Sequence, residues 1–240
     1  GPYAYTLRPG GEPQVAGMLF TPGYPGYTRG VAPVGRGEVI VTTANGAVAR
    51  YRPANQESEE LASGFDQLYG VAHTPGGAVI FAELGAGRVL SVSSGNVEEL
   101  ATGLRQPMGV AISSDGTCFI SESGAGKVVK LARGGAETVL DGLQKPQGIL
   151  VRGDLLYIVD AGARELVEYN MAGGIRRTIA ADLPVGAPPG IIPKFLRGIG
   201  DMSGPMGPFT GITDDPDGTL YISADADGSI LALRPIADVA

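Results

Sequence analysis

One phrase recurs along this chain at a nearly fixed spacing, and it constrains the fold more than any other feature of the sequence. Each copy opens on a glycine and a short apolar run, as in "GVAHTPGGAVIFAELGAGRVLSV" and "GVAISSDGTCFISESGAGKVVKL". The opening glycines are Gly30, Gly70, Gly109, Gly148 and Gly211, separated by steps of 40, 39, 39 and 63 residues. A repeat of about 40 residues indicates one supersecondary unit that is built several times.

Within each copy, apolar runs of strand length alternate with turn signals. The opening run is followed by a turn such as "SSDG", a β-rich run such as "TCFISE", a Gly/Ala turn, an alternating run and an outer run. Four antiparallel strands in about 40 residues are typical of a β-propeller blade, and the period of a helical repeat is missing. We therefore predict an all-β fold, a single β-propeller domain over 1–240 with five four-stranded antiparallel blades. A sixth, degenerate blade within 182–210 is the alternative.

The two ends of the chain predict how the ring closes. The N-terminal "AYTLRPGGEPQVAGML" matches the spacing of the outer hairpin "VLSVSSGNVEELATGL", whereas the copy from Gly211 supplies inner strands and ends soon afterwards. Pairing the N-terminal hairpin with the C-terminal blade would close the ring and remove free sheet edges. Because "YAYTLRP" and "ILALRP" both resemble third strands, the details of this pairing stay open.

Composition excludes several classes of function. The formal net charge of −7 disfavours nucleic-acid binding, which depends on Lys and Arg to neutralise phosphates. No segment approaches the ~20 uninterrupted apolar residues of a membrane helix, so we expect no membrane span.

The lone cysteine, Cys118, lies in the strand-like "TCFIS", which predicts a buried thiol. No signal segment is recognisable, so the sequence assigns no compartment, and the chain is compatible with being one domain of a larger protein.

The repeated pattern "P-x-G-V-A … D-G-x-x-[FY]-[IV]-x-[ED] … G-[RK]-V" resembles the NHL-repeat propellers. It is also similar to the SMP-30/gluconolactonase/strictosidine-synthase-like superfamily and to streptogramin-lyase-type repeats. The resemblance covers most of 30–170 and 211–234. It implies the propeller fold without choosing a function, because these relatives include lactonases, lyases, synthases and binding modules.

An acidic residue ends the second strand of several copies. The candidates are Glu83, Glu122, Asp160 and, displaced by one position, Asp225. Carboxylates on adjacent blades could hold a metal or act as general acid and base. They could equally accept backbone N–H bonds from their own Gly/Ala turns, which is the interpretation that their repetition favours.

The residues that precede the repeat glycines are a second candidate set. They are Arg29, Tyr69, Met108, Gln147 and Thr210. The resemblance to SMP-30-like lactonases implies Asp or Asn at such positions, with a Glu, around a divalent cation. None of the five is acidic or Asn, so we expect no metal and no other cofactor, and the departure counts against lactonase activity.

An insertion interrupts the period at about 186–210, and insertions in repeat folds usually decorate the binding face. By register it precedes an innermost strand, which predicts a position on the face where the central channel opens. It contributes Phe195, Met206 and Phe209, and the equivalent loop 20–30 contributes Tyr27. These side chains, with the five that precede the repeat glycines, predict an apolar ligand-binding mouth. The alternative is that the insertion only plugs the channel.

Two functions follow from these observations. The favoured one is a non-enzymatic binding module whose channel face takes an apolar small molecule, a peptide or a partner protein, with Arg29 as an anion anchor. The alternative is an SMP-30/lactonase-like hydrolase or a streptogramin-lyase-like lyase with a carboxylate-based site drawn from Glu83, Glu122, Asp160 and Asp225.

Overall fold

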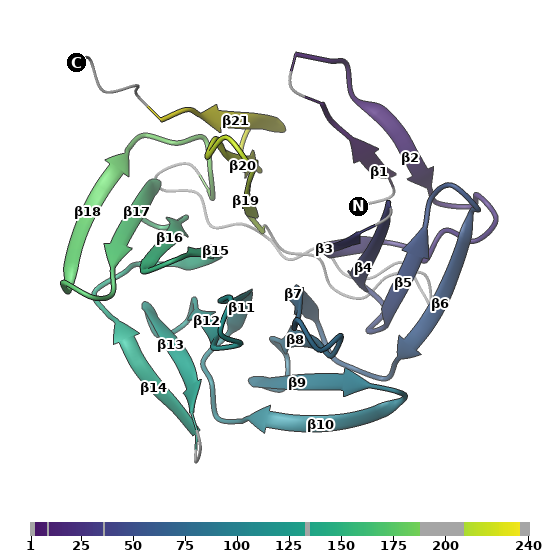
Figure 1. Cartoon of the computed structure of the whole chain (residues 1–240), viewed down its shortest axis with the longest axis horizontal. Helices are drawn as coiled ribbons and strands as arrows, with labels where there is room; N and C mark the ends of the chain where they lie inside the picture. Colours follow the sequence, from purple (N-terminus) through teal and green to yellow (C-terminus); the bar gives the residue numbers. More distant parts are fainter. Residues whose placement is uncertain (1–2, 9, 36, 133–134, 188–208, 236–240) are drawn as a thin grey trace.

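The computed structural model of the chain describes residues 3–8, 10–35, 37–132, 135–187 and 209–235. These residues form β-strands and turns arranged as blades around a central opening (Figure 1). The described part of the chain contains no helix that could cross a membrane. The predicted all-β, five-bladed propeller is confirmed.

The blades follow one another in sequence, and each is an antiparallel sheet in chain order. Blade 1 contains β3 (Thr28–Gly35), β4 (Glu38–Thr43), β5 (Val48–Arg52) and β6 (Glu57–Ala62). Blade 2 contains β7 (Leu68–His73), β8 (Val79–Glu83), β9 (Arg88–Ser93) and β10 (Asn96–Ala101). Blade 3 contains β11 (Pro107–Ile112), β12 (Cys118–Glu122), β13 (Lys127–Ala132) and β14 (Gly135–Leu140). Blade 4 contains β15 (Pro146–Arg152), β16 (Leu155–Asp160), β17 (Glu165–Asn170) and β18 (Ile175–Ala180).

Blade 5 and the N-terminal hairpin occupy the remaining arc of the ring. Among the described residues, blade 5 has three strands, β19 (Ile212–Asp214), β20 (Leu220–Ala224) and β21 (Ser229–Leu233). The hairpin β1 (Tyr3–Thr6) and β2 (Gln14–Met18) is a separate two-stranded sheet that lies between blade 5 and blade 1 (Figure 1). This placement is consistent with the predicted closure of the ring by the two ends. Most of the insertion, 188–208, and most of the region proposed for a sixth blade lie outside the described residues.

The core is divided among the interfaces between consecutive blades, because each inner strand packs against the inner strand of an adjacent blade. All five residues of β8 and all five of β12 are buried, whereas the outer strands β6 and β18 are mostly exposed. Four apolar clusters join consecutive blades, and each contains side chains from two of them. In the cluster between blades 1 and 2, for example, Ile40 packs with Phe81 and both are fully buried. Strands buried on both faces explain why the second strands are apolar without alternation.

The repeat glycines allow these blades to approach closely. A Cβ atom on Gly109 would lie 2.2 Å from the backbone carbonyl oxygen of Gln147 in the next blade. The corresponding distances are 2.2 Å from Gly30 to Tyr69, 2.3 Å from Gly70 to Met108 and 2.7 Å from Gly148 to Thr210. Because real side chains do not fit at such distances, glycine is required at these four joints. This contact explains the opening glycine in four of the five copies of the recurring phrase.

Candidate functional site

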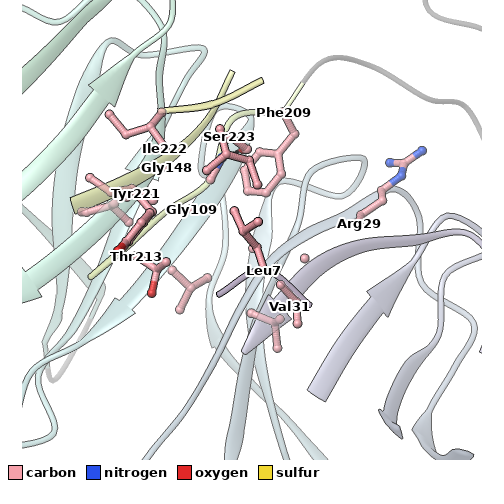
Figure 2. A pocket seen from close by; sticks show the side chains of 18 of the residues that line it. Leu7, Arg29, Val31, Gly109, Gly148, Phe209, Thr213, Tyr221, Ile222 and Ser223 are labelled. Carbon is pink, nitrogen blue, oxygen red and sulfur yellow. Dashed lines mark hydrogen bonds between the residues drawn. The ribbon is translucent and has the colours of Figure 1, made fainter. Parts of the chain in front are cut away.

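A cavity of about 610 Å³ lies at the centre of the ring (Figure 2). Every blade contributes its repeat glycine, and each also contributes the apolar residue that follows. These residues are Val31, Val71, Val110, Ile149 and Ile212. Tyr5 and Leu7 of the N-terminal segment, Ile230 of β21 and Phe209 complete the apolar wall. The volume is within the range of small-molecule pockets.

A β-bulge at the repeat glycine determines which side chains of the inner strand point into the channel. In blade 2, Leu68 pairs with Glu83 and Val71 pairs with Phe81, so three steps on the inner strand match two steps on its partner. The same extra residue occurs in the inner strands of blades 1, 3 and 4. A bulge shifts the alternation of side chains along a strand. Consequently the residue after the glycine lines the channel, and the residue before it lies within the bulge.

The predicted residues Arg29 and Phe209 do line this channel, and they are joined through Tyr69. The Arg29 guanidinium carbon lies 4.7 Å from the centroid of the Tyr69 ring. The Phe209 ring makes an edge contact with the Tyr69 ring, with the two centroids 5.5 Å apart. Burial lowers the pKa of Arg29, and the electrostatic interaction of its guanidinium with Tyr69 opposes that shift in part. An arginine remains protonated at neutral pH, so this cluster places a cation in the channel wall.

Four of the residues that precede the repeat glycines are buried and do not belong to the channel lining. They are Tyr69, Met108, Gln147 and Thr210. Gln147 Oε1 accepts a hydrogen bond from the Thr210 N–H at 2.8 Å, which ties blade 4 to the entry of blade 5. The Tyr69 hydroxyl is also buried and has no hydrogen-bond partner among the described residues. Tyr27 is half-buried outside the channel lining, and Phe195 and Met206 lie outside the described residues.

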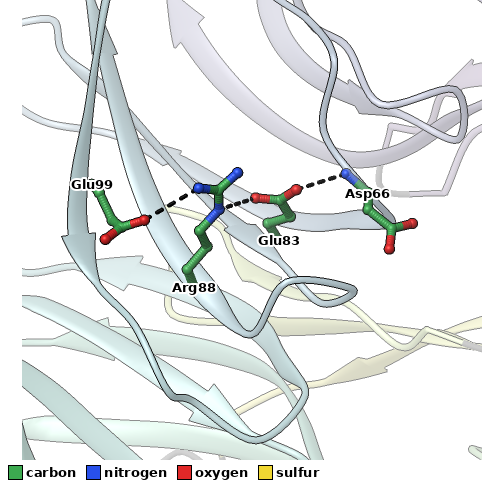
Figure 3. A network of polar contacts seen from close by, with 4 residues as sticks. All are labelled: Asp66, Glu83, Arg88 and Glu99. Atoms are coloured by element: carbon green, nitrogen blue, oxygen red, sulfur yellow. Dashed lines mark hydrogen bonds and ion pairs between the residues drawn. The ribbon is translucent and has the colours of Figure 1, made fainter.

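Glu83 and Glu122 are structural anchors for the loop that enters their own blade. The Glu83 carboxylate accepts the Asp66 N–H at 2.7 Å and pairs with Arg88, which also contacts Glu99 (Figure 3). In the same way, Glu122 accepts the Arg105 N–H at 2.8 Å and pairs with Lys127 at 3.1 Å. Both glutamates are only 2 % exposed. They are held by backbone donors rather than presented to the channel.

Asp160 and Asp225 hold the corresponding turns and entering loops of blades 4 and 5 by hydrogen bonds. Asp160 accepts four backbone N–H groups, from Gln144 and Lys145 in the entering loop and from Gly162 and Ala163 in its own turn. Asp225 Oδ1 accepts the Gly186 N–H and the Thr210 hydroxyl, each at 2.8 Å. None of the four carboxylates lines the channel.

The donor set at the inner ends of the blades does not fit a divalent cation. The side chains that precede the glycines offer a guanidinium, a phenol, a thioether, an amide and a hydroxyl, and the amide and hydroxyl oxygens are already hydrogen-bonded. A hard cation requires several free oxygen ligands, preferably carboxylates. In the described part of the chain, no three His, Cys, Asp or Glu side chains are grouped as metal ligands.

The two other reactive side chains lie away from the channel. His73 contacts the Pro33 carbonyl through Nε2 at 2.9 Å and the Thr74 carbonyl through Nδ1 at 3.2 Å. Cys118 is 5 % exposed, which confirms the predicted buried thiol, and burial raises its pKa to about 12. Neither residue belongs to the channel lining.

Sequence reasoning missed a polar pair in the wall contributed by blade 5. The Tyr221 hydroxyl donates to Asp215 Oδ2 at 2.9 Å, and both residues line the channel. Desolvation acts to raise the pKa of Asp215, but hydrogen bonds from Thr219, Tyr221 and Asp217 outweigh it, so the pKa is lowered. The hydrogen bond to Asp215 raises the pKa of Tyr221. The apolar lining was also missed, although its signal, a β-branched residue after every repeat glycine, is present in all five copies.

No protein-family model matches the chain, and no curated protein is significantly similar to it in sequence. Solved structures do resemble it. A catalytically inactive virginiamycin B lyase from Staphylococcus aureus, solved with quinupristin, is 14 % identical with a TM-score of 0.64, over 98 % of this chain and 84 % of that one. A gluconolactonase from Xanthomonas campestris is 18 % identical with a TM-score of 0.63, over 88 % and 76 %.

A nidogen/laminin complex provides a third neighbour, at 19 % identity and a TM-score of 0.62. That match covers 70 % of this chain and 66 % of the solved chain, which is just under two thirds of the latter's length. The neighbours therefore include lyases, a gluconolactonase and a component of a protein complex. At these identities they establish the fold alone, and they confirm the resemblance of this chain to β-propellers of the gluconolactonase and streptogramin-lyase type.

Proposed function

We propose that the protein is a binding module whose central channel takes an apolar small molecule that carries an anionic group. The observation behind this proposal is the composition of the 610 Å³ channel, which has an aliphatic side chain from every blade and the Arg29 guanidinium at one wall. Enclosing an apolar group of the size of a leucine or phenylalanine side chain contributes ~1.5–3 kcal/mol. Two such groups would contribute ~3–6 kcal/mol against the cost of association before any contribution from the cation.

The alternative is an enzyme of the hydrolase or lyase class. It is supported by the fold of the lyase and gluconolactonase neighbours and by the Asp215–Tyr221 pair, a carboxylate and a phenol joined in the channel wall. The carboxylates first considered for it, Glu83, Glu122 and Asp160, accept backbone N–H groups away from the channel. The binding role rests on the apolar lining of the channel, and the enzymatic role rests on the Asp215–Tyr221 pair in the same wall. Turnover of a lactone or a streptogramin that is lost in Asp215→Asn would favour the enzyme instead.

The proposal can be tested with 2-naphthoate, which combines an apolar ring system with a carboxylate. Fluorescence titration of the protein is expected to give saturable binding. Val31→Glu introduces a charge into the wall at a side chain that is already 64 % exposed, so it should weaken binding at least ~10-fold without loss of folding. Val97→Glu is the matched control, since Val97 lies on the outer strand β10 and is 46 % exposed.

A second pair of titrations examines the cation. Arg29→Gln should weaken binding of 2-naphthoate while leaving that of the neutral 2-naphthylmethanol unchanged, because only the carboxylate interacts with the guanidinium. If naphthoate does not bind, or if Val31→Glu and Val97→Glu behave alike, the channel is not the binding site.

A further inference from the structure

Gly211 lacks the close contact with a backbone carbonyl of the next blade that requires glycine at the other four repeat positions. A Cβ atom on Gly211 would find Ser223 Oγ, in its own blade, as its nearest neighbour among the described residues, at 3.6 Å. The φ angle of Gly211 also lies outside the left-handed region that favours glycine. Neither the neighbouring blade nor the backbone conformation therefore requires glycine at this position.

At two of the other joints, a hydroxyl also bridges the N–H of the repeat glycine and a carbonyl of the next blade. At Gly211, the described residues provide only the first of these two hydrogen bonds. In blade 3, the Ser121 hydroxyl accepts the N–H of Gly109 at 2.7 Å and donates to the Gln147 carbonyl of the next blade at 2.6 Å. Thr42 links Gly30 and Tyr69 in the same way. Ser223 of blade 5 accepts the Gly211 N–H at 2.7 Å, but within the described ranges its hydroxyl meets no carbonyl of a following blade. Blade 5 thus carries both the glycine and the hydroxyl of the joint, and no described residue of a following blade meets either of them.

The hairpin β1–β2 bounds the other side of this position. The third strands of blades 1 to 4 pair with a strand on each side, whereas β1 pairs with β2 alone among the described strands. A second cavity of about 480 Å³ lies between the hairpin and blade 1, and it shares Tyr5, Arg29, Gly30 and Val31 with the channel. The space beside β1 therefore borders the channel.

Apolar side chains around this space are exposed. Tyr5 is 57 % exposed, Val31 is 64 % exposed and Ile230 is 53 % exposed. In blades 2, 3 and 4, which have a blade on each side, the equivalents of Val31 are by contrast buried: Val71, Val110 and Ile149 are 7, 8 and 6 % exposed. The exposed side chains belong to three separate elements that face one position in the ring, which we call the inner-strand slot, bounded by Gly211, Ser223, β1, Gly30 and Val31.

We propose that the inner-strand slot binds a β-hairpin of a partner polypeptide that carries the inner half of this repeat. An extended backbone is the ligand that satisfies a row of strand N–H and C=O groups such as the inner edge of β1. A carbonyl of the first strand of the incoming hairpin would meet Gly211 and the Ser223 hydroxyl, as Gln147 meets Gly109 and Ser121. A glycine in that strand would be required where it abuts blade 1. The incoming hairpin would make the same contact that consecutive blades of this chain already make four times. Its binding differs from that of a small molecule, because the ligand is a polypeptide backbone.

The chain itself provides the probe. A peptide of residues 107–122 with Cys118→Ser contains the inner hairpin of blade 3, and with a fluorescent label it can be titrated by anisotropy. We expect saturable one-to-one binding to the protein. The same peptide with Gly109→Leu should bind at least ~10-fold more weakly, because its new side chain would meet the carbonyl of blade 1 as a Cβ on Gly30 would meet that of Tyr69.

A protein variant tests the slot from the other side. Gly211→Val is expected to melt at the same temperature as the wild type, since nothing in the described part of the chain occupies that space, and to lose peptide binding at least ~10-fold. Gly76→Val is the matched control, because Gly76 also has an ordinary φ and open surroundings, with Thr74 Oγ1 at 3.7 Å, and lies in a turn outside the slot.

Four results would overturn the proposal. They are absence of peptide binding up to about 1 mM, wild-type binding by Gly211→Val, a loss of stability in Gly211→Val as large as that in Gly109→Val, and a dimer of the chain that Gly211→Val dissociates. The last result would identify the occupant as a second copy. Peptide binding without naphthoate binding would support the slot and reject the small-molecule function, so the two proposals fail separately.

Discussion

The carbonyl oxygen of Tyr69 lies 2.2 Å from the position that a Cβ atom on Gly30 would occupy. The Thr42 hydroxyl closes the same joint, since it accepts the Gly30 N–H and donates to that carbonyl. Backbone thus meets backbone between the blades, with one small hydroxyl between them. This relationship determines which residue types the joint tolerates.

Gly109→Ala should destabilise the protein by ~1–3 kcal/mol or more, because its methyl group would overlap the Gln147 carbonyl and force the two blades apart. Gly76→Ala is the control, with Thr74 Oγ1 at 3.7 Å as its nearest contact. Urea unfolding of the two variants measures the difference. Equal stability of both variants would show that the joint can relax without loss.

Glu122→Ala should lower the free energy of unfolding by ~1–2 kcal/mol, since it leaves the Arg105 N–H without its acceptor. Glu137→Ala removes a carboxylate that pairs with Lys130 at the surface and is 61 % exposed, so a change within about 0.5 kcal/mol is expected. Binding of 2-naphthoate should persist in both variants. Loss of binding with an unchanged melting temperature would make Glu122 a site residue.

Cys118 should resist alkylation in the folded protein. Its thiol is buried and its pKa is raised to about 12, so the reactive thiolate is scarce at pH 8. Iodoacetamide is expected to label the residue only after denaturation, as judged by intact mass. Rapid stoichiometric labelling under native conditions would contradict this placement.

Asp115 predicts one component of the acid sensitivity. Hydrogen bonds from the Ser113 hydroxyl and the Thr117 N–H lower the pKa of its carboxyl. A folded-state pKa below the unfolded value of ~3.9 stabilises the protein above that pH, and this contribution is lost as the pH falls through the folded pKa. Asp115→Asn should therefore be less stable than the wild type at pH 6, with the difference fading as the pH falls below the unfolded value of ~3.9. A difference that stays constant across this range would exclude the charge as its cause.

The sequence correctly predicted the blades and their order but identified few of the residues that line the channel. Blade 2 shows the reason. The pattern from Gly70 to Glu83 specifies two strands and a turn, which local spacing can reveal. The bulge at Gly70 is a feature of the pairing between strands, and it moves the channel-facing position from Tyr69 to Val71. Likewise, Tyr5 and Leu7 line the channel because the N-terminal segment lies between blade 5 and blade 1 (Figure 1). Such placement depends on contacts distant in sequence.

Replacement of 190–207 by a short Gly/Ser link should leave the melting temperature of the ring nearly unchanged, because each blade packs mainly on its neighbours. If the insertion is the recognition element of the channel face, as its sequence predicts, the same variant should lose binding of 2-naphthoate. Circular dichroism and fluorescence titration measure the two outcomes. A variant that folds and still binds would identify the insertion as a plug.

A single carboxylate oxygen, Asp225 Oδ1, holds the chain on both sides of the insertion, through the Gly186 N–H and the Thr210 hydroxyl. The ends of that segment are therefore pinned together whatever lies between them, and lengthening a pinned loop adds only ~0.6 kcal/mol of entropy for each doubling. Selection can vary the number and kind of residues at this junction while the blades keep their register. The junction is consequently suited to the exchange of one specificity for another during divergence, and to the grafting of foreign peptides by design.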